Sequence, residues 1–320
     1  HYERGLVTGV GPVRLTVPRS RKGFTSLVFE RYGRRQAELN QAIGEMFVKG
    51  ASTVQVGEII ETLTGVQPSP SAVSRVHQTL QAEFEAWKQR PLLAQYLYVF
   101  ADGTYFTVIY DDAGHKMPVL AVVGITPAGT REVLAFITGD RENELAWADV
   151  LSDLQRRGLQ SVGLWITDGN QAMLNALAAK FPTTPRQCCV KHKLANVLSY
   201  IPKAQQAQVE PELKAIFYQS SRAKADQAWV AFCEKYEPLY PTAVACLKRD
   251  GEACLAFYAF PQAHWKTIRT TNIIERLFEE VKKRSHKMNA AFRNEDSCLL
   301  LFYAVIRGLK FRRITVETKA

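Results

Sequence analysis

Two aspartates stand at positions where a carboxylate is unusual in a folded chain. Asp102 interrupts a stretch of aromatic and β-branched residues, and burying a lone carboxylate there is costly unless a cation or a hydrogen-bond donor compensates. Asp168 follows a compact apolar stretch, at the carboxyl end of an expected buried strand, where open α/β sheets bind ligands. If the two strands are neighbours, the pair forms a hard-oxygen site suited to Mg²⁺ or Mn²⁺. The alternatives are a salt-bridged Asp102 and an Asp168 that only caps a turn.

A third carboxylate, Glu275, lies at the start of the last long helix. With Asn272 as the helix N-cap, Glu275 occupies the third helical position, where a glutamate often completes a capping box by bonding a backbone N–H. Glu279 and Lys282 follow on the same helical face, opposite the apolar stripe. That face could present a carboxylate to a metal and a cation to a phosphate, so the spacing leaves both roles of Glu275 open.

Cysteine and histidine residues form a further candidate group. Cys189 and His192 are three residues apart, which puts two metal-ligating side chains on one helical face. No second pair stands at zinc spacing and the six cysteines form no CxxC motif, so we favour packing or substrate positioning over a zinc site. Asn196 belongs to the same segment. His264 and Trp265 could stack on an unpaired nucleic-acid base, although an aromatic in the core is the favoured explanation.

A sheet must carry the two aspartates. Three strand-like segments joined by short turns predict an antiparallel meander: 96–109, 116–125 and 131–138. A helix is expected over 142–157, and its buried face is predicted to contain Trp147, Val150, Leu151 and Leu154. A strand over 162–167 then ends at Asp168, and a further helix runs through Lys180. Three antiparallel strands, a crossover helix and another strand form the start of a ribonuclease-H-like core.

The chain before this core is basic. Residues 1–35 alternate around a Gly-Pro turn, which predicts a β-ribbon whose arginines, including Arg14 and Arg19, could follow a phosphate backbone; a solvated hairpin fits equally well. Residues 36–91 contain three helical segments typical of a helix-turn-helix unit, whose third helix, about 72–87, would enter the major groove. The outward-facing residues of that helix are predicted to be Ser74, Arg75 and Gln78. Small helical bundles that bind no DNA show the same pattern.

The last part of the chain is mostly helical. Pro261 and the His264–Trp265 segment are expected to interrupt the helices, and an apolar helix over 297–309 ends in a basic tail. The expected fold class is therefore α/β, with a ribonuclease-H-like catalytic core (a mixed sheet flanked by helices) and an all-helical insertion. The predicted domains are a basic β-ribbon at 1–35, a helix-turn-helix domain at 36–91, the first part of the core at 92–188, a helical insertion at 189–265 and the last part of the core at 266–320.

Composition narrows the class of partner. The chain is 47% hydrophobic and 22% charged, an ordinary mix for a folded protein, but its formal net charge is +10. A surplus of that size favours a polyanionic partner such as nucleic acid, although a basic but inert surface fits it as well. The apolar stretches are far shorter than the ~20 residues that span a bilayer, and no signal peptide is present, so we expect a cytoplasmic protein without membrane association. The chain begins with His1, so we expect further N-terminal sequence.

Several motifs occur together and in a fixed order. They are Phe-Ala-Asp-Gly-Thr-Tyr at 100–105, Ile-Thr-Asp-Gly at 166–169, Cys-x-x-His-x-x-x-Asn at 189–196 and Thr-Thr-Asn-x-x-Glu-Arg at 270–276. With Met-Phe-Val-Lys-Gly-Ala-Ser-Thr at 46–53 and Phe-Pro at 260–261 before His264 and Trp265, this set resembles the motifs of Mutator-type (IS256-family) bacterial transposases. The resemblance covers nearly the whole chain.

The resemblance implies a function. Asp102, Asp168 and Glu275 would be a DDE triad holding two divalent cations, Mg²⁺ or Mn²⁺. Glu275 lies 107 positions after Asp168, and the interval would contain the family's helical insertion. The protein would bind transposon terminal inverted repeats, cleave the ends to free 3′-OH groups and join them to target DNA by two-metal phosphoryl transfer. We expect a bacterial, nucleoid-associated homodimer on DNA and no small-molecule substrate. Basic residues beyond Glu275 would hold the DNA backbone: Lys282, Lys283 and Arg284.

Two alternatives remain. A transposase-derived regulator would keep the DNA-binding unit but typically lose an acidic residue, whereas all three are present here. A ribonuclease-H-like nuclease would hydrolyse nucleic acid without joining it, and the helix-turn-helix unit and large insertion argue against that.

Overall fold

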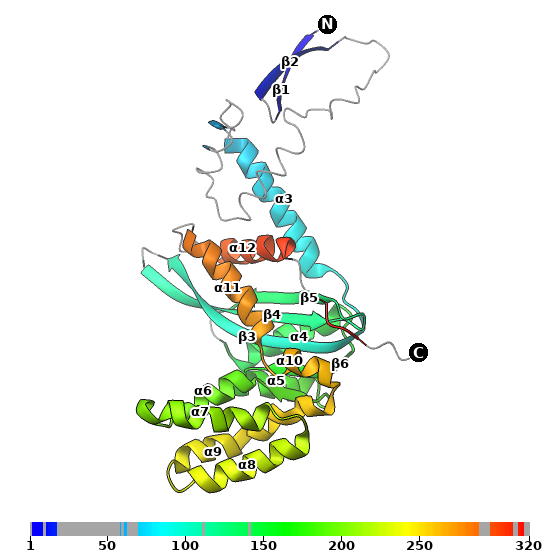
Figure 1. Cartoon of the computed structure of the whole chain (residues 1–320). Helices are drawn as coiled ribbons and strands as arrows, with labels where there is room; N and C mark the ends of the chain where they lie inside the picture. The colour runs from blue at the N-terminus through cyan, green and yellow to red at the C-terminus, as the bar shows by residue number, and fades with distance from the viewer. Residues whose placement is uncertain are drawn as a thin grey trace. The chain divides into compact units, whose positions relative to one another are not determined.

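The computed structural model describes nine ranges of the chain: 2–8, 11–17, 58, 61–62, 70–110, 113–139, 142–287, 295–309 and 313–316. The chain divides into two compact units. One comprises residues 1–89, 108–114 and 280–309, and the other comprises 90–107, 115–279 and 310–320. Figure 1 shows the helices and strands with the labels used below.

A five-stranded sheet lies at the centre of the second unit, with its strands in the order β5-β4-β3-β6-β7. Their bounds are β3 Gln95–Tyr110, β4 Ala113–Ile125, β5 Arg131–Thr138, β6 Ser161–Thr167 and β7 Arg186–Cys188. β4 and β5 are antiparallel, whereas β3, β6 and β7 are parallel to one another. The sheet is therefore mixed, as the sequence predicted.

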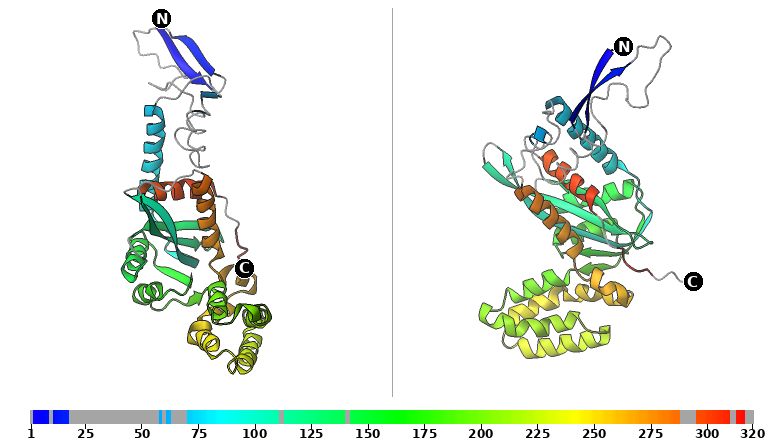
Figure 2. Two further views of the ribbon diagram at one scale, coloured as in Figure 1. Left: turned by 90° about the vertical axis from the view of Figure 1, so that its left-hand side faces the viewer. Right: turned by 45° about the horizontal axis from the view of Figure 1, so that its top comes forward.

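Two helices cover one face of this sheet, α4 (Glu144–Arg156) and α5 (Gln171–Lys180) (Figures 1 and 2). The carboxamide oxygen of Asn143 caps α4 by accepting the N–H of Ala146 at 2.9 Å. The buried residues of α4 are those predicted from its periodicity: Trp147, Val150, Leu151 and Leu154. They pack in one apolar cluster with strand residues such as Val99 and Leu120 and with Met173 and Leu177 of α5. This core fixes β3 and β6, the two strands that carry the aspartates.

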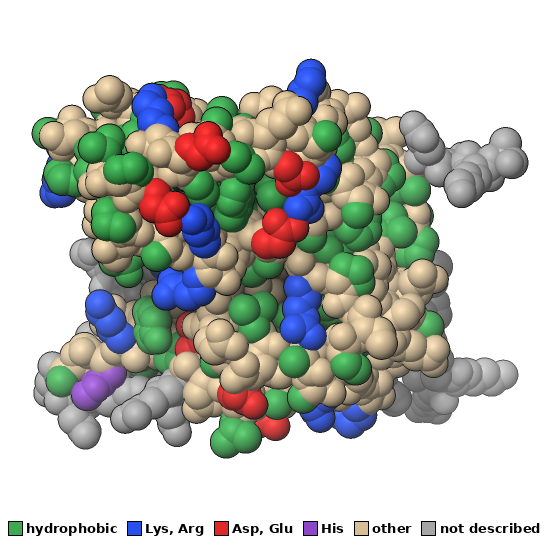
Figure 3. Space-filling model, turned by 90° about the horizontal axis from the view of Figure 1, so that it is seen from below, with side chains coloured by type: hydrophobic (Ala, Val, Ile, Leu, Met, Phe, Trp, Pro, Cys, Tyr) green, Lys and Arg blue, Asp and Glu red, His purple; other side chains and the backbone are tan. Residues whose placement is uncertain are grey.

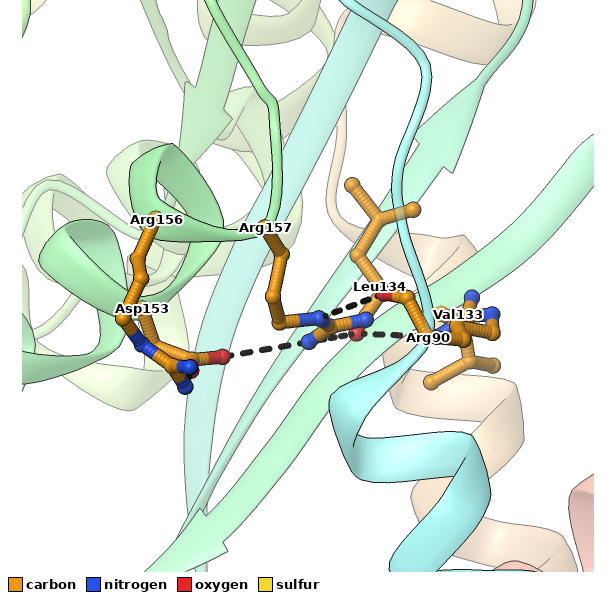
Figure 4. Close-up of polar contacts among 6 residues, drawn as sticks. All are labelled: Arg90, Val133, Leu134, Asp153, Arg156 and Arg157. Carbon is orange, nitrogen blue, oxygen red and sulfur yellow. Dashed lines mark hydrogen bonds and ion pairs between the residues drawn. The ribbon is translucent and has the colours of Figure 1, made fainter.

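The start of β3 is fixed by two arginines, Arg90 and Arg157 (Figure 4). Leu134 is skipped in the pairing of β4 with β5, and this β-bulge leaves its carbonyl free to accept the Nη1 of Arg157 at 2.9 Å. Nε of Arg157 donates to the carbonyl oxygen of Arg90 at 3.0 Å, and its charge faces Asp153 at 3.1 Å. Nη2 of Arg90 donates to the carbonyl oxygen of Val133 at 2.7 Å. These bonds hold the segment before β3 against β5 and the end of α4.

A series of helices separates β7 from the last long helix. Their bounds are α6 Val190–Leu198, α7 Lys203–Phe217, α8 Arg222–Tyr236, α9 Pro241–Asp250, the 3₁₀ helix η1 Gly251–Ala259 and α10 Gln262–Ile268. One expectation was wrong here, because His264 and Trp265 do not interrupt the helices but lie inside α10. The break falls before them, and Pro261 stands as the N-cap of α10, where its missing N–H costs nothing.

Cations and anions alternate on the surface of these helices. Figure 3 shows the lower face of the view in Figure 1, where Lys and Arg side chains lie beside Asp and Glu side chains. Ion pairs on the exposed surface of α7, α8 and α9 include Lys214–Glu210, Arg222–Asp226, Arg222–Glu252, Lys235–Glu212 and Lys248–Glu237. Because these cations are paired, they contribute little to an attraction for phosphate.

The first unit contains β1 (Tyr2–Thr8) and β2 (Gly11–Val17), which pair antiparallel, and the helices α3 (Pro70–Gln89) and α12 (Glu295–Gly308). Phe84 of α3 packs on Tyr303 of α12 with ring centroids 5.4 Å apart. The third helix, expected over about 72–87, is α3 and extends two residues further at each end, beginning at Pro70 in the first helical turn. The first two helices expected in 36–91 lie almost wholly outside the described residues. Among the helices the structure describes, none is both long and apolar enough to cross a bilayer.

Candidate active site

Asp102 and Asp168 lie at the same level of two neighbouring strands. β3 and β6 are parallel, and their register pairs Phe100 with Ile166 and Ala101 with Thr167. Each aspartate is the next residue along its chain, so the two carboxylates leave the sheet side by side. The condition set from the sequence, that the two strands be neighbours, is met.

The turn after β6 orients Asp168. Gly169 has a φ of 89°, a conformation that residues with a Cβ rarely adopt. Oδ1 of Asp168 accepts the N–H of Asn170 at 2.9 Å, so the turn-capping role considered for Asp168 is present. Asn170 in turn caps α5 by accepting the N–H of Ala172 at 2.9 Å. The cap engages one oxygen of Asp168, and the second carboxylate oxygen remains a potential ligand.

Asp102 is a buried carboxylate whose pKa is raised. The residue is 6% exposed. Burial, and then the charge of Asp168, raise the pKa of Asp102 from 3.8 to about 7, while the charge of His192 and the N–H of Gly103 lower it in part. Asp102 is buried and Asp168 is half-buried, and a divalent cation between two such carboxylates would offset the repulsion of their charges. The salt-bridge alternative for Asp102 is not what the structure describes, since no Lys or Arg ion pair to it occurs among the described residues.

A fourth carboxylate, which the sequence analysis missed, lies beside the pair. Glu142 precedes α4, and its Oε1 accepts Nε1 of Trp147 and Nδ2 of Asn170, each at 3.3 Å. A Cβ on Gly103 would stand 2.9 Å from Oε2 of Glu142, so this carboxylate passes directly over the backbone next to Asp102. Burial, and then the charge of Asp168, raise the pKa of Glu142. The one sequence signal for a site role of Glu142 is its position four residues after Thr138, the last residue of β5.

Glu275 lies on α11 (Asn272–Lys287) and points away from its own backbone. The carbonyl of Thr271 accepts the N–H of Glu275 at 3.1 Å and starts the helix. Oε2 of Glu275 accepts Nζ of Lys191, while Oε1 lies 3.8 Å from Nε2 of His192 and has no hydrogen-bond partner in the described part of the chain. The capping-box alternative is therefore not formed, because the carboxylate turns toward α6.

Cys189 and His192 lie at the start of α6, next to Glu275. Cys189 is completely buried and is the N-cap residue, but its side chain makes no capping bond. Sγ of Cys189 accepts the N–H of Thr271 at 3.4 Å. Burial raises the pKa of the Cys189 thiol, but the donors of His192 and Thr271 outweigh it and the net shift is downward. The sulfur of Cys189, followed by Asp102 and Asp168, raises the pKa of His192 to about 9.

The donor set fits divalent cations, but the triad is not closed. Carboxylate oxygens from Asp102, Asp168 and Glu275 are the ligands that Mg²⁺ and Mn²⁺ prefer. Within the residues described, however, the group whose donor atoms all lie within 4.8 Å of one another is Cys189, His192 and Glu275. The structure thus brings Asp102 and Asp168 together and places Glu275 with Lys191 and His192, and the charge of His192 also acts on Asp102. A free Oε1 on Glu275 and the charge repulsion at Asp102 both suit the arrival of a cation.

The remaining predicted site residues have ordinary surroundings. Asn196 is exposed on α6. Nδ1 of His264 lies 2.6 Å from the hydroxyl of Tyr98 and Nε2 lies 2.8 Å from the carbonyl of Thr315. Nε1 of Trp265 donates to the carbonyl of Phe260 at 2.7 Å. These contacts match the core alternative for His264 and Trp265, and their role in substrate positioning stays a prediction.

The residues predicted to contact DNA are only partly described. Arg14 is exposed on β2, and Gln78 is exposed on α3. Lys282 is half-buried, and Lys283 forms an ion pair with Glu280 at 3.2 Å on α11. The side chains of three further residues, and the whole of a fourth, lie outside what the structure describes: Ser74, Arg75 and Arg284, and Arg19.

Comparisons with known proteins bear on the whole chain. Residues 1–313 match the family described as "Transposase, Mutator family". The chain is 33% identical over 308 residues to the transposase for insertion sequence element ISRM5 of Rhizobium meliloti, covering 95% of this chain and 77% of that protein. It is 31% identical over 313 residues to the IS905 transposase of Lactococcus lactis, covering 98% and 79%.

A further relative is the transposase for IS256 in transposon Tn4001 of Staphylococcus aureus. The two chains are 33% identical over 313 residues, which is 97% of this chain and 80% of that protein. The family match therefore extends over both units and includes all three acidic residues of the triad. As its ordered motifs indicated, the chain belongs to the Mutator family of transposases.

Proposed function

We propose that this chain is a DNA transposase that binds the terminal inverted repeats of its element, cleaves the ends to free 3′-OH groups and joins them to target DNA. One observation carries the proposal: the buried Asp102 and the half-buried Asp168 follow paired positions of two parallel strands, and the charge of Asp168 raises the pKa of Asp102, in a member of a transposase family. The relatives named above are transposases of insertion sequences, which supports the same substrate class.

The sheet, in this proposal, is a ribonuclease-H-like core. Its support is the strand order β5-β4-β3-β6-β7, in which three consecutive strands precede two strands parallel to β3. α4 is the crossover between β5 and β6, and α11 carries Glu275, which would complete the site of the two aspartates. The helices between β7 and α11 are then the insertion of the family.

Asp102, Asp168 and Glu275 would hold two divalent cations, Mg²⁺ or Mn²⁺. Such cations activate the attacking oxygen and stabilise the leaving oxygen of a phosphoryl transfer. The chain's own residues keep the ligands in place: the Asp168–Asn170 turn orients one carboxylate, and Lys191 holds Oε2 of Glu275 while Oε1 stays available. Water would attack the phosphate at the transposon end first, and the freed 3′-OH would then attack target DNA.

DNA would be held by basic residues outside the triad. Arg14 and Gln78 are exposed, as contacts with phosphates and base edges require, and we assign the same task to Arg19, Ser74, Arg75 and Lys282–Arg284. We further propose a homodimer on DNA, because two transposon ends must be brought together for joining.

The test is a joining assay with a labelled transposon end and plasmid DNA. Wild-type protein should join the end in Mg²⁺ and not in EDTA. Asp102→Asn should abolish cleavage and strand transfer but still bind terminal-repeat DNA with unchanged affinity, whereas Asp149→Asn, on the exposed side of α4, should behave as wild type.

The outcomes separate the alternatives. Full strand transfer by Asp102→Asn refutes the assignment of the triad. Binding without any Mg²⁺-dependent cleavage in wild type identifies a regulator, and cleavage without joining identifies a nuclease.

A further inference from the structure

Three different donor atoms meet beside the carboxylates, from two segments far apart in the sequence. Cys189 and His192 come from the start of α6, and Glu275 comes from α11, more than eighty residues later. One sulfur, one imidazole nitrogen and one carboxylate oxygen all lie within 4.8 Å of one another. The CxxH spacing was visible in the sequence, but its third donor was not.

The chemistry of this group differs from that of the aspartate pair. Thiolate and imidazole ligands select Zn²⁺ and similar borderline-soft cations, whereas carboxylates alone select Mg²⁺ and Mn²⁺. Three protein ligands of mixed N, S and O type leave one tetrahedral position open for water. Cys189, His192 and Glu275 would therefore prefer Zn²⁺, whereas Asp102, Asp168 and Glu275 would prefer Mg²⁺ or Mn²⁺. Glu275 belongs to both groups of ligands.

The three donors are prepared for a ligand. The Cys189 side chain is fully buried, oriented by the N–H of Thr271 at 3.4 Å, and not used to cap α6. Nδ1 of His192 and Oε1 of Glu275 are both buried, and neither has a hydrogen-bond partner among the described residues. Buried polar atoms without partners are rare and call for an explanation such as an ion.

A purely structural cluster explains less. Lys191, which is 59% exposed, forms its ion pair with Oε2 of Glu275. The other carboxylate oxygen, Oε1, is left without a hydrogen-bond partner among the described residues. A cation could bind Oε1 without displacing Lys191. Packing alone would also not require a histidine whose Nδ1 is buried without a bond.

We propose that Cys189, His192 and Glu275 form a site for Zn²⁺, separate from the site of Asp102 and Asp168 but sharing Glu275 with it. Binding releases to solvent the protons carried by the thiol and by the imidazolium of His192, since a thiolate and a neutral imidazole are the ligands. Because one carboxylate serves both sites, Zn²⁺ bound here withdraws Glu275 from the aspartate pair. This consequence rests on the proposed function: micromolar Zn²⁺ would then inhibit Mg²⁺-dependent joining.

Co²⁺ is the probe for the site, since a cobalt–thiolate bond gives an ultraviolet charge-transfer band that Mg²⁺ sites do not produce. Titration of the full chain with Co²⁺, without Mg²⁺, should produce this band, and Zn²⁺ should remove it at one equivalent. Cys189→Ser should abolish the band, and His192→Gln should weaken Co²⁺ binding at least about ten-fold. The buried neighbour Cys188 gives the matched control, and Cys188→Ser should keep the band, as should Asp102→Asn.

No charge-transfer band in wild type, or an undiminished band in Cys189→Ser, overturns the proposal. If Cys189→Ser unfolds by circular dichroism, His192→Gln decides the matter, and unchanged Co²⁺ affinity in that variant refutes it. The band does not depend on catalysis, so a chain that binds Co²⁺ through Cys189 but joins no DNA would refute the proposed function and leave this site standing.

Discussion

Replacing Asp102 with asparagine should stabilise the protein at neutral pH while removing its activity. The side chain is buried, and the pKa of Asp102 is raised from 3.8 to about 7 by burial and by the charge of Asp168. A difference of about three pK units corresponds to about 4 kcal/mol of destabilisation when the carboxylate is ionised. Asparagine has nearly the same shape and no charge, so about 4 kcal/mol is the upper value of the gain.

The pH dependence follows from the sign of the shift. Because the pKa of Asp102 is higher in the folded chain than in the unfolded chain, the folded state binds the extra proton between about pH 4 and pH 7. The contribution of Asp102 to stability therefore falls as pH rises through this window and is constant above it. Between pH 5 and pH 8, wild type should lose about 3 kcal/mol relative to Asp102→Asn.

Urea or thermal unfolding in EDTA at pH 5 and pH 8 measures this difference, with the exposed Asp149→Asn as the control. Adding Mg²⁺ at pH 8 should stabilise wild type and not Asp102→Asn, because the cation neutralises the carboxylate pair. Parallel pH profiles for wild type and Asp102→Asn would refute the reasoning, since the cost of burying the charge would then be absent.

Three further predictions concern neighbours of the site. Glu142→Gln keeps a hydrogen-bond acceptor for Trp147 but removes a negative charge beside Asp168. The Mg²⁺ concentration for half-maximal cleavage should therefore rise roughly ten-fold. An unchanged Mg²⁺ titration would contradict this prediction. Arg157→Met removes donors to buried carbonyls and should cost about 2–4 kcal/mol in urea unfolding, and an unaltered unfolding midpoint would count against it. Gly169→Ala forces a Cβ into a φ of 89° at a cost of about 1–2 kcal/mol. Its cleavage rate should fall below that of Gly169→Asn, because asparagine tolerates positive φ, and equal rates would argue against this role of the turn.

The parts of the site that lie on regular elements could be predicted from the sequence. Strand periodicity around Asp102 and the apolar run before Asp168 placed both at positions where a sheet exposes ligands. The buried face of α4 followed from helical spacing alone. These signals are local, so a window of ten to fifteen residues contains them.

Other parts depend on contacts between distant segments. Glu275 meets Lys191 across 84 positions, and no pattern near either residue indicates the pair. Glu142 belongs to the irregular segment before α4, where no periodicity marks a direction. For the same reason the sequence did not show that Glu275 lies beside Cys189 and His192. Nor did it show that His264 forms a hydrogen bond with Tyr98, which is 166 positions away.

The arginines beside β5 also bear on how copies of the chain can associate. β5 ends the strand order, and an outermost strand is open to continuation of the sheet by another molecule. At Leu134 the bulge distorts the strand, and the carbonyls of Val133 and Leu134 already accept Arg90 and Arg157. This stretch is thereby closed to strand addition, which protects the chain from edge-to-edge aggregation. The homodimer proposed above would therefore have to form through a surface other than the middle of β5.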